Sequence, residues 1–270
     1  MISVVIPSYN HEKYILKTLE SIAEDSFEDK EIVIIDDGST DSSDKLISEW
    51  VEKNKDRVLI TYKHRANKGL NATLNELLSL AKGEYIVLMG SDDYLLEGGL
   101  KKRYDYFKSH PQTKVLIGDA ILIDGDDNKL YDSMLFDFRE YKREQFRDPK
   151  SIKKTLFKRF VLAGPIYMVK KDFYDEIGGY DESFLAEDLD FCLRALAKDE
   201  MSFLDEKVCA YRIHDTNQSL AGITPRLLRD SAKAFWKNMH LYPMREKPIM
   251  MWNIFKFLVR EFLLRLGLRK

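Results

Sequence analysis

Two adjacent aspartates, Asp92 and Asp93, follow an apolar run at residues 84–90 that is typical of a buried strand. One of them could cap the helix expected after them and favour its dipole. The free-energy cost of burying a second carboxylate at the same strand end must be offset by hydrogen bonds or by a cation. Hard divalent cations prefer oxygen ligands and often complete their coordination with phosphate oxygens. The pair therefore predicts a site for a diphosphate and its metal ion.

Asp36 and Asp37 end an earlier apolar run in the same way and precede the sequence GSTDSSD. A turn at Asp-Gly, followed by a capped helix, would account for residues 38–44 without any ligand. That explanation does not say why two acids end a buried strand. Turn formation and ligand binding therefore both remain open at this position.

A third acidic group, which includes Glu187 and Asp188, stands at the expected start of a helix. Interaction with the helix dipole would explain it, at about 0.5 kcal/mol. A carboxylate at a helix start beside a cleft could also accept a proton from a hydroxyl group. His214 follows an expected strand, where a single histidine is more often structural than a metal ligand.

The elements that must position these residues alternate along the first 125 residues. Apolar runs typical of strands cover 2–7, 31–37, 57–63, 84–90 and 114–124, with helical patterns between them at 12–25, 42–55, 70–83 and 96–109. Continuous Val, Ile and Leu runs between helices predict an open, mostly parallel, twisted α/β sheet covered on both faces. Ligands of such sheets bind outside the carboxyl ends of the strands, where the loops after Pro7, Asp36 and Gly90 would meet.

The pattern is less regular beyond residue 125. No element is assigned between residues 126 and 165, which are rich in aromatic and charged side chains. A short helix, a Gly178-Gly179 turn, a helix from near Glu187 and strands over 201–214 follow. We expect a main domain over residues 1–220 and a helical C-terminal extension over residues 221–270.

Composition and missing motifs exclude several classes of protein. The net charge of −2 over 270 residues gives no overall attraction for nucleic acid. The first strand is followed by neither a P-loop nor a Gly-x-Gly-x-x-Gly segment. Cys192 and Cys209 are expected to be buried, reduced thiols. The chain shows no secretory signal and no apolar run near the roughly 18 residues of a membrane span, so we expect a cytoplasmic protein.

Five segments taken together resemble the family 2 glycosyltransferases, which have the GT-A nucleotide-sugar-binding fold. They are VVIPSYN, EIVIIDDGSTD, NKGLNATLNELLSLAKGEYIVLMGSDD, IGGYDESFLAEDLDFCLRA and YRIHDTNQS, in the family's order and spacing across roughly residues 1–220. Each segment alone is modest evidence, but five in register are hard to obtain by chance. The resemblance implies a nucleotide-binding part at about residues 1–125 and an acceptor-binding part at 126–220.

The resemblance also implies a role for each matched residue. The implied nucleotide-binding residues are Pro7, Ser8 and Tyr9 around the base, Asp36 bonded to the base, Asn67, Lys68 and Gly69 nearby, and Ser91 and Asp92 toward the ribose. Asp93 and His214 are the implied ligands of Mn²⁺ or Mg²⁺. Asp188, next to Glu187, is the implied catalytic base. Many relatives have Asp where this chain has Gly90, which leaves the division of roles between Asp92 and Asp93 open.

These roles imply an inverting transferase that moves one sugar from a nucleotide-diphosphate sugar, most commonly a UDP-sugar in this family. The implied acceptor is a hydroxyl group of a glycan or a lipid-linked oligosaccharide in bacterial surface-glycan synthesis. A single transfer is expected because the Gln-x-x-Arg-Trp motif of processive synthases is absent. The alternatives are an inactive nucleotide-sugar-binding protein and a nucleotidyltransferase, which would carry a Gly-rich basic loop where this chain has PSYNHEKY.

The C-terminal stretch predicts a helix with one apolar face. This face contains Phe255, Leu258, Val259, Phe262 and Leu266. Basic residues flank it, namely Lys256 and Arg260 on one side and Arg265 and Arg269 on the other. The helix could pack on the catalytic domain or on a second subunit. It could instead lie on an anionic membrane with its basic side chains reaching the headgroups, at the inner face of the cytoplasmic membrane.

Overall fold

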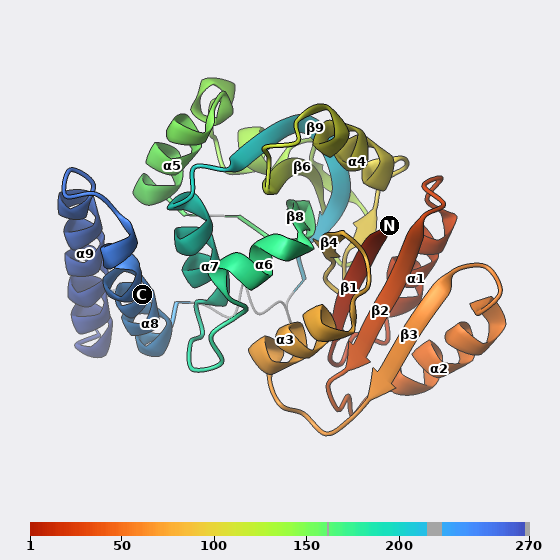
Figure 1. Ribbon diagram of the computed structural model, residues 1–270. Helices are drawn as coiled ribbons and strands as arrows, with labels where there is room; N and C mark the ends of the chain where they lie inside the picture. The colour runs from red at the N-terminus through yellow and green to blue at the C-terminus, as the bar shows by residue number, and fades with distance from the viewer. Residues whose placement is uncertain (161, 215–222, 268–270) are drawn as a thin grey trace.

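The computed structural model describes residues 1–160, 162–214 and 223–267. Within them a nine-stranded sheet has the strand order β3-β2-β1-β4-β8-β6-β9-β5, and β7 pairs with β6 outside this path. Figure 1 shows the sheet running through the middle of the molecule with helices on both sides. The α/β class expected from the sequence is confirmed.

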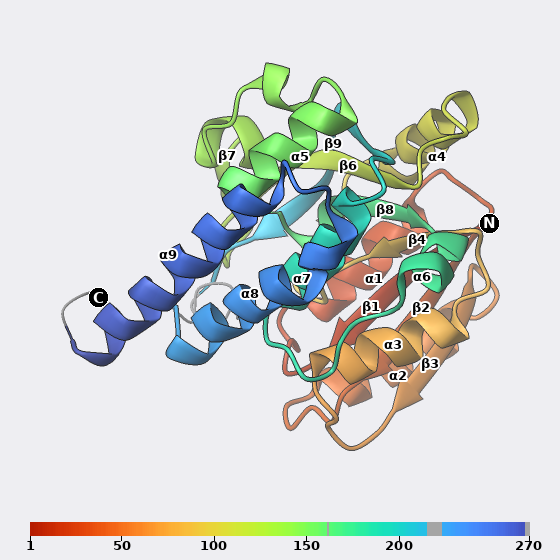
Figure 2. The ribbon, with the colours of Figure 1, turned by 60° about the vertical axis from the view of Figure 1, so that its left-hand side comes forward.

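The first four strands in the sequence are parallel and form one half of the sheet. They are β1 (Ile2–Ser8), β2 (Lys30–Asp36), β3 (Leu59–His64) and β4 (Tyr85–Leu88), connected by α1 (Ile15–Glu24), α2 (Ser43–Asn54) and α3 (Leu70–Leu80). Crossovers of this kind are right-handed. The path moves outward to β3 and then returns to β4, so α1 and α2 cover one face and α3 the other (Figures 1 and 2). Strand order reverses between β1 and β4, which is where such sheets bind ligands.

The helices on both faces explain the unbroken apolar runs of the sequence. In β1, Ile2, Val4, Val5 and Ile6 are all at most 1% exposed, although neighbouring side chains point to opposite faces of the sheet. A strand buried on both faces carries no polar alternation. The prediction of covered, parallel strands is therefore confirmed for this half.

The other half of the sheet is mixed. Its strands are β5 (Tyr94–Leu95), β6 (Val115–Ile123), β7 (Lys129–Tyr131), β8 (Tyr167–Lys170) and β9 (Met201–Arg212), and α4 (Gly99–Ser109) precedes β6. β8 is antiparallel to both β4 and β6, whereas β9 is parallel to β6. The expected parallel arrangement therefore applies in full to the first four strands. The chain reverses direction between β6 and β8, which makes β8 antiparallel to its neighbours.

Residues 126–165, which the sequence pattern left unassigned, contain short elements. They are a π-helical turn at Met134–Phe138 (η1), 3₁₀ turns at Arg143–Phe146 (η2) and Gly164–Ile166 (η3), and the helix α5 (Pro149–Lys158). The side chain of Asp148 caps α5 by accepting a hydrogen bond from the Ser151 N–H at 2.8 Å, with Pro149 at the first helical position. This is a regular helix start that aromatic and charged neighbours obscure in the sequence.

Helices complete the chain. They are α6 (Lys171–Ile177), α7 (Glu187–Leu196), α8 (Pro225–Asn238), the 3₁₀ turn η5 (Met239–Leu241) and α9 (Lys247–Arg265). Figure 2 shows α8 between α7 and α9, with α9 at the outer edge of the molecule. The expected domain boundary at residue 220 and the residues 215–219 of the last motif lie outside the described residues.

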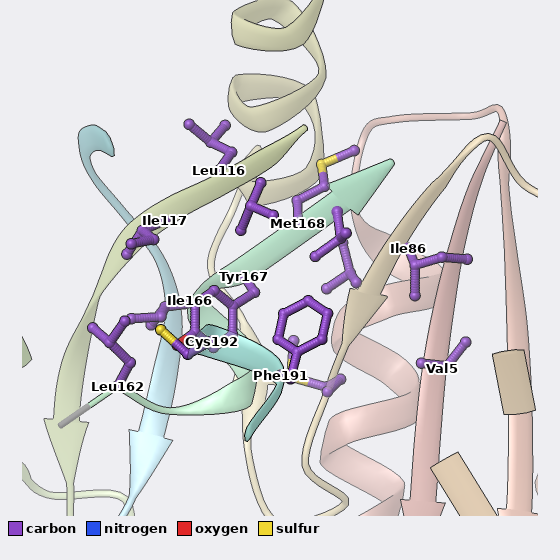
Figure 3. Close-up of a cluster of buried hydrophobic side chains, with 14 of the residues drawn as sticks. Val5, Ile86, Leu116, Ile117, Leu162, Ile166, Tyr167, Met168, Phe191 and Cys192 are labelled. Carbon is purple, nitrogen blue, oxygen red and sulfur yellow. The ribbon is translucent and has the colours of Figure 1, made fainter. Parts of the chain in front are cut away.

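One hydrophobic core joins the two halves of the sheet. Figure 3 shows Val5 and Ile86 of the parallel strands near Met168 of β8 and Phe191 of α7. Cys192 and Cys209 are buried free thiols, as expected. Among the described residues, no helix combines the length and the apolar character that crossing a membrane requires.

Candidate active site

Asp36 ends β2, and its carboxylate is fully buried. One oxygen, Oδ1, accepts a hydrogen bond from the Ser39 N–H at 2.9 Å and lies 3.0 Å from Nδ1 of His64. The other, Oδ2, accepts from the hydroxyl of Ser39 at 2.6 Å and from that of Ser8 at 3.4 Å. These bonds offset the cost of burying the charge. The turn interpretation is therefore part of the explanation, and Asp36 also connects the ends of β1, β2 and β3.

The neighbouring Asp37 holds the segment before α3. Its carboxylate accepts hydrogen bonds from the backbone N–H groups of Lys68 at 2.9 Å and Gly69 at 3.0 Å. The guanidinium group of Arg65 pairs with the same carboxylate. Gly38 fits here because a Cβ atom on it would lie 2.7 Å from the backbone nitrogen of Asn67. The loop after β2 and the segment Asn67–Gly69 are thereby fixed against each other.

Three possible metal ligands meet at the reversal of strand order. The ligand atoms of His11, Asp92 and His214 all lie within 4.8 Å of one another. Nε2 of His214 is 3.0 Å from Oδ2 of Asp92, and Nδ1 of His11 is 2.7 Å from the hydroxyl oxygen of Ser91. The side chains of His214 and Asp92 are 6% and 13% exposed. This group lies at the carboxyl end of the sheet, where the sequence predicted a diphosphate and its metal ion.

Asp93 lies beside this group but is not one of its members. Its Oδ1 accepts the N–H of Arg212 at 2.8 Å, and its carbonyl oxygen accepts the hydroxyl of Thr18 at 2.6 Å. Burial and the charge of Asp92 raise the pKa of the Asp93 carboxyl group well above its usual value. The sequence expected Asp92 at the ribose and Asp93 on the metal, whereas Asp92 is the aspartate that contacts His214.

Gly90 lies directly over both carboxylates. A Cβ atom on this residue would lie 2.6 Å from Oδ2 of Asp93 and 2.7 Å from Oδ1 of Asp92. Cβ atoms do not approach other atoms so closely, so a side chain here would displace both carboxylates. The glycine that distinguishes this motif from a longer acidic string therefore lets the two carboxylates converge.

A buried arginine supports the loop that carries Asp92. The Nε atom of Arg212 donates to the Asp92 carbonyl oxygen at 2.7 Å, and its Nη1 donates to the Asp124 carbonyl oxygen at 2.9 Å. Its Nη2 pairs with Asp127 at 2.6 Å, and the guanidinium group lies over the ring of Tyr14 at 4.6 Å. This role could not be predicted from the sequence, because Arg212 is an ordinary strand residue in the pattern of β9.

Glu187 and Asp188 form the first turn of α7 and are partly exposed. Burial raises the pKa of the Asp188 carboxyl group to about 6. Burial and the charge of Asp188 raise the pKa of the Glu187 carboxyl group to about 8. Both carboxyl groups therefore hold a proton more tightly than a carboxyl group in water does. A carboxylate with a raised pKa is a stronger base than one in water.

Two asparagines of α3 hold the loop that leads to Glu187. The amide of Asn71 donates to the carbonyl oxygens of Asp181 at 2.7 Å and Phe184 at 2.9 Å. The amide of Asn75 bonds both backbone groups of Tyr180. Since α3 begins directly after Gly69, it connects the segment held by Asp37 with the start of α7.

The other predicted nucleotide-binding residues lie on the same loops. Pro7 and Tyr9 are at the end of β1, and the Tyr9 side chain is 44% exposed. Lys68 and Asn67 are exposed before α3. The structure thus gathers the predicted residues of β1, β2 and β4 with His214 at one edge of the sheet. α3 holds the loop over residues 180–184 that leads to Glu187 and Asp188. Sequence reasoning did not single out His11 or Arg212, and it gave Asp37 no role separate from that of Asp36.

Two cavities of about 480 Å³ each lie apart from the metal-ligand group. One is lined by Tyr106, His110 and Ser202, near the starts of β6 and β9 and thus at the opposite end of the sheet from Asp92. The other is lined by Asn75, Tyr180, Asp181, Arg194 and Lys237. This second cavity borders the loop before Glu187.

Several known proteins are similar to this chain in sequence. The chain matches the family model described as Glycosyl transferase family 2 over residues 3–178. An uncharacterized glycosyltransferase of Methanocaldococcus jannaschii is 30% identical over 244 residues, which are 88% of this chain and 80% of that protein.

Two solved structures share the fold. TarS of S. aureus, residues 1–349 in complex with UDP-GlcNAc, matches with a TM-score of 0.69 and 20% identity over 95% of this chain and 80% of that one. The mannosyltransferase PcManGT from Pyrobaculum calidifontis, in complex with GDP-Man and Mn²⁺, matches with a TM-score of 0.68 and 17% identity over 100% of this chain and 76% of that one.

Proposed function

The chain belongs to glycosyl transferase family 2 and has the GT-A fold, and on this premise we propose that it moves one sugar from a nucleotide-diphosphate sugar to a hydroxyl group with inversion at the anomeric carbon. The observation that carries the proposal is the meeting of the loops after β1, β2 and β4 with His214, at the edge next to which α3 holds the loop before Glu187. In this proposal a charged donor would bind at this edge, and Asp188 would act on the acceptor hydroxyl beside it.

The donor would bind along the ends of β1, β2 and β4. Pro7, Ser8, Tyr9 and Asp36 would surround the base, with Asn67, Lys68 and Gly69 near the nucleotide and Ser91 and Asp92 toward the ribose and diphosphate. The exposed ring of Tyr9 offers a surface for stacking, and the exposed Lys68 offers a positive charge. UDP is the nucleotide we propose. TarS with UDP-GlcNAc and PcManGT with GDP-Man support a nucleotide-diphosphate sugar as the donor class.

Mn²⁺ or Mg²⁺ would bind at Asp92 and His214, in place of the pair Asp93 and His214 expected from the sequence. Adjacent ligands of one ion lie roughly 3 Å apart, and Nε2 of His214 and Oδ2 of Asp92 are 3.0 Å apart. A bound divalent cation would offset the charge of the donor diphosphate and of the departing nucleotide. Asp93, bonded to the Arg212 N–H, would hold the loop in place.

Asp188 would act as the catalytic base. It would accept the proton of the acceptor hydroxyl while that oxygen bonds to the anomeric carbon. The bond from this carbon to the diphosphate breaks in the same step, and its electron pair leaves with the nucleotide diphosphate. Attack from the opposite side turns an α-linked donor into a β-linked product. Glu187, with its raised pKa, would remain protonated beside it.

Release of nucleotide diphosphate from a panel of nucleotide sugars, with Mn²⁺ and without it, tests the proposal. Asp188→Asn should lower the rate of nucleotide release by about 10³-fold while donor binding, measured by calorimetry, is kept. A protein that only binds nucleotide sugars would release nothing in either form. A nucleotidyltransferase would form pyrophosphate from a nucleoside triphosphate and a sugar phosphate. An active Asp188→Asn protein would contradict the assigned base.

We further propose that the acceptor is a glycan or a lipid-linked oligosaccharide in surface-glycan synthesis and that α9 brings the protein to the inner face of the membrane. The apolar face expected from the sequence points outward, since Phe255 is 56% and Phe262 59% exposed. The opposite face, with Met250 and Ile254, is buried. Packing on the catalytic domain therefore does not cover the predicted face. Lys256 and Arg260 lie in the same helix, while Arg269 lies outside the described residues.

A further inference from the structure

We propose that the imidazole of His11 is a third protein ligand of the cation, and that it makes the site selective for divalent transition-metal ions such as Mn²⁺ and Co²⁺ over Mg²⁺. This inference rests on the proposed function only in placing a cation at Asp92 and His214. His11 follows β1 and belongs to none of the residues to which the family resemblance gives a role.

The spacing of the three side chains fits one ion. Ligands bound to the same ion lie roughly 3 Å apart when adjacent and about 4 Å apart when opposite. The ligand atoms of His11, Asp92 and His214 lie within 4.8 Å of one another. A closure of less than about 1 Å, well within the range of side-chain rotation, would therefore bring all three onto one ion.

The fold brings His11 to this place and holds its ring. β1 and β4 are neighbouring parallel strands, so the loop after β1 lies beside Ser91 and Asp92. The backbone N–H of His11 donates to the Ser43 hydroxyl at 3.0 Å. Nδ1 of His11 lies 2.7 Å from the Ser91 hydroxyl oxygen, so Nε2 is the ring nitrogen that would bind an ion. Metal-bound histidines commonly use their second nitrogen in such an orienting hydrogen bond.

Aromatic contacts fix the two imidazole rings against each other. The rings of His11 and His214 lie 5.6 Å apart at an interplanar angle of 82°, and Tyr14 lies 4.8 Å from His214. Both imidazoles therefore approach Asp92 in packed orientations. Ordered ligands of this kind bind an ion with little loss of side-chain entropy.

The donor set decides which ion binds. Two imidazoles and one carboxylate suit transition metals, and affinity rises from Mn²⁺ to Co²⁺ along the divalent series. Mg²⁺ prefers oxygen ligands and retains its waters. Three protein ligands would leave further positions on the ion for oxygen atoms of the donor diphosphate and for water. His11 would therefore shift the site away from Mg²⁺ and let the ion bind before the donor.

Calorimetry on the full chain without nucleotide tests this inference with MnCl₂, CoCl₂ and MgCl₂. His11→Asn is the informative variant, because the asparagine amide can keep the bond to Ser91 while the ligand nitrogen is lost. We expect a decrease of at least about tenfold in Mn²⁺ and Co²⁺ affinity and a change in Mg²⁺ affinity below about threefold. His110→Asn, at the opposite end of the sheet, is the matched control and should bind as the wild type does.

Pulsed EPR on the Mn²⁺-loaded wild-type protein gives a second measurement that needs no variant. We expect the Mn²⁺ electron spin to couple to two imidazole nitrogens in the wild type and to one imidazole nitrogen in His11→Asn. Coupling to a single nitrogen in the wild type, or unchanged Mn²⁺ affinity in His11→Asn, would overturn the role of His11 while the proposed transferase stands. The opposite result is also possible. If His11→Asn loses the preference for Mn²⁺ but the wild type releases no nucleotide from any sugar donor, the metal site is supported and the proposed transferase function is contradicted.

Discussion

Nε2 of His214 lies 3.0 Å from Oδ2 of Asp92, although the two residues are 122 positions apart in the sequence. β9 delivers His214 to the carboxyl edge of the sheet because it runs parallel to β6 and ends beside the loop after β4. The contact joins the two halves of the molecule at the reversal of strand order. A mixed sheet thus builds a site that the parallel half alone would leave incomplete.

The first prediction concerns the pH dependence of turnover. Burial raises the pKa of Asp188 to about 6, and a base must be deprotonated to act. The value of kcat should therefore fall about tenfold per pH unit below about pH 6. Asp188→Asn should lower kcat by about 10³-fold at pH 7.5. Steady-state rates between pH 5 and pH 9 measure both effects. A flat profile down to pH 5 in the wild type would contradict the role of Asp188.

The second prediction concerns stability. Burial and the charge of Asp188 raise the pKa of Glu187 from 4.5 to about 8, so the native state holds this proton more tightly than the unfolded chain does. The resulting stability is fully present below about pH 4.5 and is lost as the pH rises to about 8. Glu187→Gln should not lose stability in this way as the pH rises, because the glutamine side chain does not ionise. The variant should be more stable than the wild type by about 1–2 kcal/mol at pH 9, after discounting for partial exposure, and nearly equal at pH 5.

Urea unfolding at the two pH values measures this difference. Glu144→Gln, which removes an exposed carboxylate, is the matched control and should show the same small effect at both pH values. A Glu187→Gln protein no more stable than the wild type at pH 9 would show that Glu187 ionises at its ordinary pKa.

Much of the site could be predicted from the sequence because strand ends are local features. Apolar runs located the ends of β1, β2 and β4, and parallel strands end at one edge of the sheet. The residues Ser8, Asp36 and Asp92 therefore had a predictable common position. The order of the family motifs predicted that His214 is a metal ligand, whereas its local sequence alone would have indicated a structural role.

The remaining features depend on contacts that no local pattern records. His11 owes its position to Ser91, 80 residues away, and Arg212 owes its burial to the Asp124 and Asp127 turn. Which of Asp92 and Asp93 faces His214 depends on side-chain direction after the strand has ended, where the two-residue alternation no longer applies. In α9 the sequence shows one apolar face but cannot say that the other face, with Met250 and Ile254, is the buried one.

The third prediction concerns Gly90. Gly90→Ala would place a Cβ atom about where the carboxylates of Asp92 and Asp93 converge, at 2.7 and 2.6 Å in the present arrangement. We expect the fold to persist, with a loss of about 1–3 kcal/mol in the free energy of unfolding. Mn²⁺ affinity should fall by at least about tenfold because Asp92 must move. Calorimetry and urea unfolding measure the two effects. Unchanged Mn²⁺ affinity would show that Asp92 is not a ligand.

The fourth prediction concerns the outward face of α9. Trp252, Phe255, Leu258, Val259 and Phe262 are each at least 39% exposed. Basic residues adjoin this face, and three lysines, Lys150, Lys154 and Lys158, are exposed on the neighbouring α5. A side-chain bond from Asn253 to the Phe157 carbonyl oxygen at 2.7 Å holds α9 to α5. Apolar side chains flanked by positive charge favour an anionic lipid surface, whereas two such faces in a dimer would bring like charges together.

Co-sedimentation with vesicles tests this preference. The wild type should bind vesicles containing phosphatidylglycerol, weakly bind neutral phosphatidylcholine vesicles, and lose binding as salt rises, since surface attraction is screened within about 10 Å at 0.1 M salt. Phe255→Ser with Phe262→Ser should weaken binding by at least about tenfold, because two phenyl rings no longer enter the apolar layer. These side chains are exposed, so the variant should unfold at the same urea concentration as the wild type. Equal vesicle binding by the wild type and the variant would exclude α9 as the membrane contact. If light scattering shows that the wild type is a dimer and the variant a monomer, the outward face of α9 binds a second subunit instead.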